Sequence, residues 1–196
     1  GIYIPKKHCS NSAAVLRYPQ YALNAVRPGV ALYGLSPDNS PKSKIFGEFG
    51  LKPAMTLKTC FMQVRKLKAG DTVSYGAAKL SRDTDVGVIG VGYADGYSRR
   101  LSGKGFIMAG GKELPIIGKI CMDMTMIDLE NSVIKAGTEA VLFGYDRKSE
   151  KTLDIERIAA LAGTINYELL CDVGRRVTRV YIENGNEIKF TGLLDT

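Results

Sequence analysis

Short alternating segments separated by glycine turns fill the chain beyond residue 50, and this pattern most constrains the fold. In residues 55–62 the side chains alternate between two faces, as expected for a β-strand with two different environments. Two glycine-containing pairs predict hairpins: Gly110-Gly111 in "GFIMAGGKELPI" and Asn184-Gly185 in "VYIENGNEIKF". A type I′ turn at Asn184-Gly185 needs both residues at positive φ. We therefore expect a mostly β domain, an antiparallel barrel or sandwich.

A small helical insert interrupts this β pattern. Thr152 is expected to cap a first helix, with Asp154 and Glu156 in its favourable first turn. Thr164 is expected to cap a second helix, which begins within "TINYELL". The apolar positions of the first helix share one face: Ile155, Ile158, Ala159 and Ala162.

The first 35 residues differ from the rest in their pattern of residue types. Small residues and a proline in "SNSAAVLRYPQY" indicate a loop or short helix, and the apolar run after it predicts a strand at Val30–Leu35. The Pro- and Ser-rich stretch "SPDNSPKSK", residues 36–44, then reads as a linker. We therefore divide the chain into 1–44, the tail of another domain with its linker, and 45–196, the β domain.

Composition excludes several classes of protein. The four cysteines lie far apart with no CxxC pair, which favours reduced thiols in a cytoplasm over a disulfide framework. His8 is the only histidine and no GxSxG sequence is present, so neither a histidine-based metal site nor a serine hydrolase is expected. No signal peptide is visible and no apolar run reaches the ~18 residues of a membrane span.

The chain is basic, with 27 Lys and Arg against 20 Asp and Glu and a net charge of +7. These basic residues are scattered through turns and form neither a run nor an aromatic-interleaved stripe. The balance fits a solvated surface or a site for small anions such as phosphate, and nucleic-acid binding is not expected.

One tyrosine stands in an unusual frame, "GVGYADGYSRR". Gly92 and Gly96 bracket Tyr93, and Asp95-Gly96 is a strong tight-turn pair. The frame has two readings: a hairpin corner whose tyrosine packs, or a corner that holds one polar side chain at a fixed angle.

Six stretches occur in an order that resembles the C-terminal half of the alanine racemase family. They are "HCSNSAAVLRYP", "NAVRPGVALYGLSP", "VSYGA", "GVGYADGYSRR", "GKICMDMTMIDL" and "AGTINYELL". The resemblance implies a pyridoxal 5′-phosphate enzyme with an N-terminal TIM-type barrel and a β domain, residues 1–35 being the last βα unit of that barrel. No segment matches the family's Schiff-base lysine motif, so the chain resembles a fragment expected to be inactive alone.

The resemblance also assigns a catalytic role to Tyr93. Tyr93 would move the α-proton on one face of the substrate, while the lysine serves the other face. A phenol with a pKa of about 10 is a poor base at neutral pH, so positive charge or hydrogen bonds must favour its anion. Arg99 and Arg100 are the nearby candidates for that charge.

Cofactor contacts follow from the same resemblance. Arg27 would face the pyridine nitrogen; because arginine only donates, that nitrogen would stay unprotonated and be a weak electron sink. Met122 would border the substrate carboxylate, although Met122, Met124 and Met126 also alternate like a plain strand. The remaining cofactor-binding candidates are Ser12, Gly29, Val30 and Tyr167 at the phosphate and His8 beside the ring.

The resemblance implies interconversion of L- and D-alanine for cell-wall precursors in a homodimer, where Tyr93 completes the partner's site. Serine or another small amino acid is the alternative substrate, because a small apolar pocket rejects an added hydroxyl weakly. A barrel-plus-β decarboxylase is a second alternative. A basic β-barrel that binds nucleic acid or protein is a third, from another class, and it would have no reason to carry the Arg27 and Tyr93 motifs.

Overall fold

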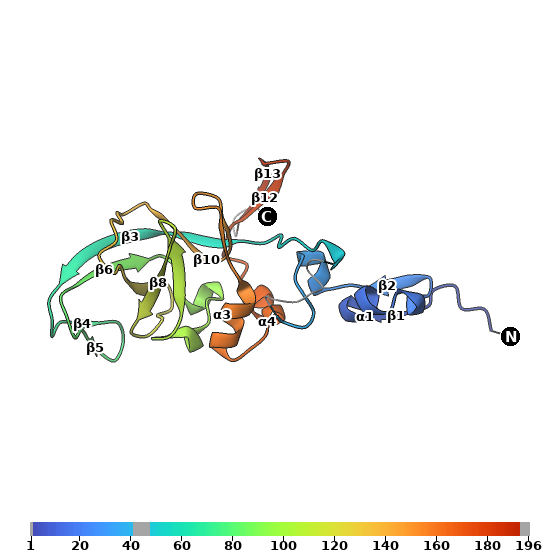
Figure 1. Ribbon diagram of the computed structural model, residues 1–196, viewed down its shortest axis with the longest axis horizontal. Helices are drawn as coiled ribbons and strands as arrows, with labels where there is room; N and C mark the ends of the chain where they lie inside the picture. The colour runs from blue at the N-terminus through green and yellow to red at the C-terminus, as the bar shows by residue number, and fades with distance from the viewer. Residues whose placement is uncertain (1, 41–47, 193–196) are drawn as a thin grey trace.

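The computed structural model describes residues 2–40 and 48–192. Two parts are visible in Figure 1, a small N-terminal unit at one end and a larger β domain at the other. No helix in the described ranges is long and apolar enough to cross a membrane.

The N-terminal unit is a strand–helix–strand piece of a parallel barrel. Strand β1 (His8–Asn11) leads into helix α1 (Ser12–Arg17), and β2 (Ala25–Arg27) returns parallel to β1. A 3₁₀ turn, η1 (Pro19–Tyr21), lies between α1 and β2. A parallel pair joined by a helical crossover is the repeating unit of a TIM-type barrel, which confirms the predicted origin of this segment.

The predicted strand at Val30–Leu35 is wrong. The chain forms a 3₁₀ helix instead, η2 (Val30–Tyr33). The Ser12 hydroxyl accepts the amide protons of Gly29 at 2.8 Å and Ala31 at 3.3 Å, which holds the backbone in a turn. A short apolar run has no period that separates a strand from a helix, so the side-chain contact decided the outcome.

One antiparallel sheet forms most of the β domain, and its strands run in an order far from that of the sequence. Across the sheet they are β11 (Lys151–Leu153), β10 (Glu139–Asp146), β3 (Leu57–Leu67), β6 (Thr84–Ile89), β9 (Thr125–Asp128), β8 (Lys112–Ile117) and β7 (Phe106–Ala109). A separate small ribbon consists of β4 (Thr72–Val73) and β5 (Ala78–Lys79).

The sheet closes on itself through strand β10. Besides β3 and β11, β10 pairs with β7 at the opposite end of the sheet order, with Val141 opposite Met108. Strands β10, β3, β6, β9, β8 and β7 thus form a ring in which each has two neighbours. Closure satisfies strand edges that an open sheet would leave unpaired. The predicted antiparallel barrel is confirmed.

Both predicted hairpins are present. Strands β7 and β8 pair across Gly110-Gly111. Strands β12 (Arg179–Glu183) and β13 (Asn186–Thr191) pair across the second turn, where Asn184 has φ 51° and Gly185 has φ 82°. These two positive angles are those that a type I′ turn requires.

The helical insert is confirmed, but the two predicted caps are wrong. The insert consists of α3 (Ile155–Ala162) and α4 (Asn166–Asp172). Thr152 lies in β11 opposite Tyr145, because pairing with β10 continues to that point. Thr164 donates its hydroxyl to the Glu168 carboxylate, and Ile165 takes the position before α4. The apolar face predicted for the first helix is buried in α3.

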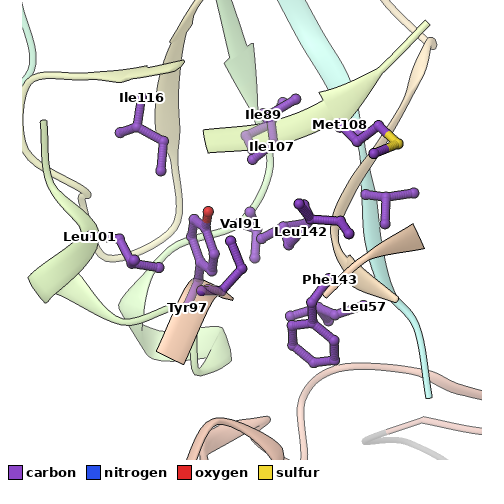
Figure 2. Close-up of a cluster of buried hydrophobic side chains, with 14 of the residues drawn as sticks. Leu57, Ile89, Val91, Tyr97, Leu101, Ile107, Met108, Ile116, Leu142 and Phe143 are labelled. Carbon is purple, nitrogen blue, oxygen red and sulfur yellow. The ribbon is translucent and has the colours of Figure 1, made fainter. Parts of the chain in front are cut away.

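The barrel interior is filled by large apolar side chains, among which one tyrosine carries a polar group. Figure 2 shows the Tyr97 ring lying among Val91, Leu101 and their neighbours in this core. The Tyr97 hydroxyl is buried and has no hydrogen-bond partner among the described residues. Burial raises the pKa of Tyr97, because the core disfavours the phenolate.

Tyr97 predicts a loss of stability at alkaline pH. In the unfolded chain the phenol ionises near pH 10, whereas the folded state keeps it neutral to higher pH. The stability that depends on a neutral Tyr97 is therefore fully present below pH ~10. Above that pH the free energy of unfolding falls by up to ~1.4 kcal/mol per pH unit. Urea unfolding between pH 8 and 11 should show this decline in the wild type and a shallower one in Tyr97→Phe. At neutral pH, Tyr97→Phe should be more stable by ~1 kcal/mol, since an unpaired buried hydroxyl is removed. Parallel curves for the two proteins would contradict this account.

Candidate functional site

The first group of site residues lies where α1 and η2 begin. Asn11 caps α1 by accepting the Ala14 amide at 3.0 Å. Ser12, the first residue of α1, is buried, and its hydroxyl oxygen accepts two amides from the start of η2. The Ser12 hydroxyl therefore keeps its own proton available for an acceptor. Two helical N-termini at one serine form a setting that suits an anion.

Arg27 and His8 lie on the paired strands beside this point. Arg27 opposes Asn11, and its Nη2 donates to the Cys9 carbonyl at 3.2 Å. That bond uses one of the five guanidinium N–H groups, and the side chain is exposed. His8 opposes Ala25 near the start of the pair and is also exposed. The structure thus brings Ser12, Arg27 and the start of η2 together at one end of the parallel pair.

Tyr167 lies on α4 and reaches the segment that follows η2. Its hydroxyl donates to the Pro37 carbonyl at 3.4 Å. Burial, and after it the Asp38 carboxylate, raises the pKa of Tyr167, so the phenol stays protonated and able to donate. The structure therefore places Tyr167 against the linker.

A buried polar cluster fastens this linker to the helical insert. The backbone N–H of Asn166 donates to Asn39 Oδ1 at 2.7 Å, and the side-chain Nδ2 of Asn166 donates to the Ser36 carbonyl at 3.2 Å. Asn166 Nδ2 also donates to the Glu156 carboxylate at 3.1 Å. Ser36, Glu156 and Asn166 are all buried, so the position of the linker is tied to α3 and α4.

The second group of site residues surrounds the Tyr93 turn. The turn is a 3₁₀ segment, η3 (Tyr93–Asp95), packed on the loop that precedes β9. The Tyr93 amide donates to the Cys121 carbonyl and the Ala94 amide to the Met122 carbonyl, each at 3.0 Å. Tyr93 and Met122, assigned separately from sequence, therefore lie on touching segments. Met122 itself is exposed and precedes strand β9, so the predicted strand alternation begins only after it.

Tyr75 belongs to a turn that is bonded to the same loop, although sequence reasoning gave it no role. It lies in the β4–β5 turn, where Ser74 has φ 63° and Ala77 has φ 47°, two strained values for residues other than glycine. The Ser74 hydroxyl accepts the Lys119 amide proton at 3.0 Å and donates to the Lys119 carbonyl at 2.5 Å. The motif "VSYGA" was the only sequence feature that could have pointed to Tyr75. The strained backbone of this turn and the bonds from Ser74 to Lys119 are visible only in the structure.

A lysine ammonium lies against the turn that contains Tyr75. A Cβ built on Gly76 would be 3.1 Å from Lys119 Nζ, so the Lys119 ammonium lies against the residue that follows Tyr75. Tyr75 is 70% exposed, against 42% for Tyr93. Arg99 and Arg100, predicted to supply charge to Tyr93, lie in η4 (Arg99–Leu101).

The two groups of site residues lie in different parts of the molecule. Strands β1 and β2 are at one end, whereas the barrel that carries the tyrosine turns is at the other (Figure 1). The Ser12 group and the Tyr93 group are separated within one chain by the linker and the helical insert.

Fold and site together define an antiparallel β-barrel domain attached to a parallel strand–helix–strand unit of the kind that builds TIM-type barrels. A family model described as the alanine racemase C-terminal domain matches residues 54–181, and one for the alanine racemase N-terminal domain matches residues 1–37. The chain therefore belongs to the alanine racemase family.

Individual relatives agree with this assignment. An alanine racemase of Clostridium novyi (strain NT) is 42% identical over 193 residues, which cover 96% of this chain and 48% of that protein. A crystal structure of alanine racemase from Bacillus anthracis with bound L-Ala-P has a TM-score of 0.87 at 35% identity, covering 96% of this chain and 47% of the other. A Bartonella henselae alanine racemase structure with covalently bound pyridoxal phosphate has a TM-score of 0.77 at 30% identity, covering 89% and 46%. The chain thus spans about half the length of the relatives it matches.

The close packing of the Tyr93 turn gives a direct prediction for Gly92. A Cβ at Gly92 would lie 2.3 Å from the carbonyl oxygens of both Cys121 and Met122, so Gly92→Ala must separate the turn from the loop. We expect a loss of ~3 kcal/mol in the free energy of unfolding, measured by urea titration.

Gly90→Ala is the matched control. A Cβ at Gly90 would meet only the end of the flexible Met62 side chain, with Sδ at 3.0 Å, so its cost should stay below ~1 kcal/mol. Equal losses in the two variants would show that contact with the loop does not constrain Gly92.

Proposed function

We propose that this chain is the C-terminal part of a pyridoxal-phosphate-dependent racemase that interconverts L- and D-alanine. The observation that carries the proposal is the buried Ser12 hydroxyl, which gathers two amides at the start of η2 beside Arg27. Family membership supplies the reaction class, and this arrangement supplies the phosphate and ring contacts that the class needs.

The described residues fit the cofactor. Its phosphate would be held by the Ser12 hydroxyl and the backbone at Gly29 and Val30, where helical N-termini favour negative charge. Tyr167, kept protonated, would exchange its long bond to the Pro37 carbonyl for one donated to the phosphate. Arg27 would donate to the ring nitrogen, and His8 would lie beside the ring.

When bound, the cofactor supplies an electron sink that makes the α-proton of the amino acid acidic. The chain's own task is then to hold and move a proton on one face of the substrate. Because arginine only donates, Arg27 would leave the ring nitrogen unprotonated, which keeps the sink weak and favours simple return of the proton.

Two tyrosines compete for the proton-moving role. The resemblance assigns this role to Tyr93, and backbone hydrogen bonds hold the Tyr93 turn against the loop that contains Met122. Tyr75 is the more exposed of the two, and the Lys119 ammonium lies against Gly76, the residue that follows it. We propose Tyr75 as the stronger candidate, with Tyr93 forming the adjacent wall of the site.

Alanine is the proposed substrate, with serine as the alternative. Met122 would border the substrate carboxylate and help to keep the pocket small. A decarboxylase of related architecture is disfavoured by the racemase family match over residues 54–181.

A dimer follows from the separation of the two site groups. We propose that the tyrosines of one protomer face the Ser12–Arg27 group of its partner, through a two-fold interface in which the same patches serve both subunits. The enzyme would act in the cytoplasm, where its four free cysteines stay reduced, and supply D-alanine for peptidoglycan precursors.

Phenylalanine variants of the two tyrosines in the full-length enzyme test the mechanism. Removal of the proton-moving hydroxyl should lower kcat for both directions of alanine racemisation by 10²-fold or more, while binding of pyridoxal phosphate stays unchanged. We expect Tyr75→Phe to show this loss and Tyr93→Phe a smaller one. The reverse order would assign the role to Tyr93, and wild-type turnover in both variants would overturn a tyrosine base on this surface.

Mixed dimers test the shared site. A subunit without both hydroxyls (Tyr75→Phe with Tyr93→Phe) and a subunit without the upstream Schiff-base lysine are each inactive alone. In a mixed dimer one site carries both defects and the other carries none, so activity should return. Absence of activity, with subunit exchange confirmed by mass spectrometry, would place the tyrosines in their own protomer's site.

A further inference from the structure

Arg176 lies where three segments distant in sequence meet. Its Nε donates to Asp95 Oδ1 at 2.7 Å, and its Nη2 donates to Asp123 Oδ1 at 2.6 Å. Asp95 belongs to the Tyr93 turn, Asp123 follows Met122, and Arg176 belongs to the segment between α4 and β12. One guanidinium therefore joins the two segments that carry the proposed site residues of the barrel.

Asp95 extends this connection into the turn itself. Its second oxygen, Oδ2, accepts the Gly92 amide at 2.9 Å, and its carbonyl accepts the Gly174 amide at 3.1 Å. The Asp95 side chain is only 15% exposed, so little water competes for these bonds. Arg176 thus acts on a carboxylate that already fixes the start of the turn.

The geometry suits arginine and no other basic residue. The two carboxylates accept from different nitrogens of one planar group, which a lysine ammonium on a flexible stem cannot reproduce. Both carboxylates raise the pKa of Arg176, so the cation persists at any physiological pH.

We propose that Arg176 is a positioning residue: it clamps the Tyr93 turn to the Met122–Asp123 loop and thereby sets the shape of the substrate side of the site. Within the described part of the chain Arg176 makes no hydrogen bond to either tyrosine hydroxyl, and it would act through Asp95 and Asp123. The catalytic part of this inference rests on the proposed racemase function, whereas the clamp itself does not.

Hydrogen exchange tests the clamp without reference to activity. In the full-length protein, Arg176→Gln should raise amide exchange at least ten-fold in peptides covering residues 92–97 and 119–124. The reporting amides are those of Tyr93 and Ala94, which are bonded across this junction, and that of Gly92, which is bonded to the Asp95 carboxylate that Arg176 holds. Arg157→Gln is the matched control: Arg157 makes a comparable two-bond ion pair with Glu113, at 2.6 and 3.1 Å, on α3. Unchanged exchange in Arg176→Gln, or equal loosening in the control, would overturn the clamp.

Kinetics on the same variants test its role in the site. Arg176→Gln should lower kcat/KM for alanine at least ten-fold, mainly through KM, while Arg157→Gln stays within two-fold of wild type. Arg176→Lys keeps the charge but not the bridge, so it should remain impaired; full rescue by lysine would overturn the bridging geometry. Loosened exchange with unchanged kinetics would overturn the role in positioning. A wild-type enzyme without racemase activity would instead contradict the proposed function, and the exchange result would still decide whether the clamp exists.

Discussion

Strand β10 is the constraint on which the rest of the β domain depends, because it pairs with three strands. Its contacts with β3, β7 and β11 close the barrel and anchor the chain that leads into α3. Residues Ala140–Phe143 of this strand are buried, so closure and core formation are one event. Once the ring is closed, the β6–β7 connection that carries Tyr93 has a fixed place at its end.

Polar interactions set the geometry of the Tyr93 turn within that connection. Backbone bonds from Tyr93 and Ala94, the Asp95 carboxylate and the Arg176 guanidinium all act on one short turn. Such bonds are directional, so they define orientation more tightly than apolar contacts of similar strength. Tyr93 and Tyr75 themselves remain exposed.

The linker has a comparable role between the two parts of the chain. Asn166 bonds to Ser36, Asn39 and Glu156 and ties the segment after η2 to the helical insert. These bonds are largely buried, so the cost of leaving any of them unmade is high. The segment after the N-terminal unit is thus fastened to the helical insert by the fold itself. The proposed division at residue 44 falls outside the described residues and stays a prediction.

Sequence alone determined what depends on neighbouring residues. Asn184-Gly185 set a hairpin through local φ preferences, alternation set the strands, and the spacing of Ile155, Ile158 and Ala162 set the buried face of α3. Ordered motifs indicated the family and named Ser12 and Arg27, which the structure brings together. Tertiary structure decided what depends on partners far along the chain. Bonds to Ser12 hold residues Val30–Tyr33 in a 3₁₀ helix, and pairing with β10 places Thr152 in strand β11. Lys119 lies against Gly76, the residue after Tyr75, and Arg176 joins Asp95 to Asp123. The residues in each of these pairs are separated in the sequence and meet only in the folded chain, so neighbouring residues give no signal for them.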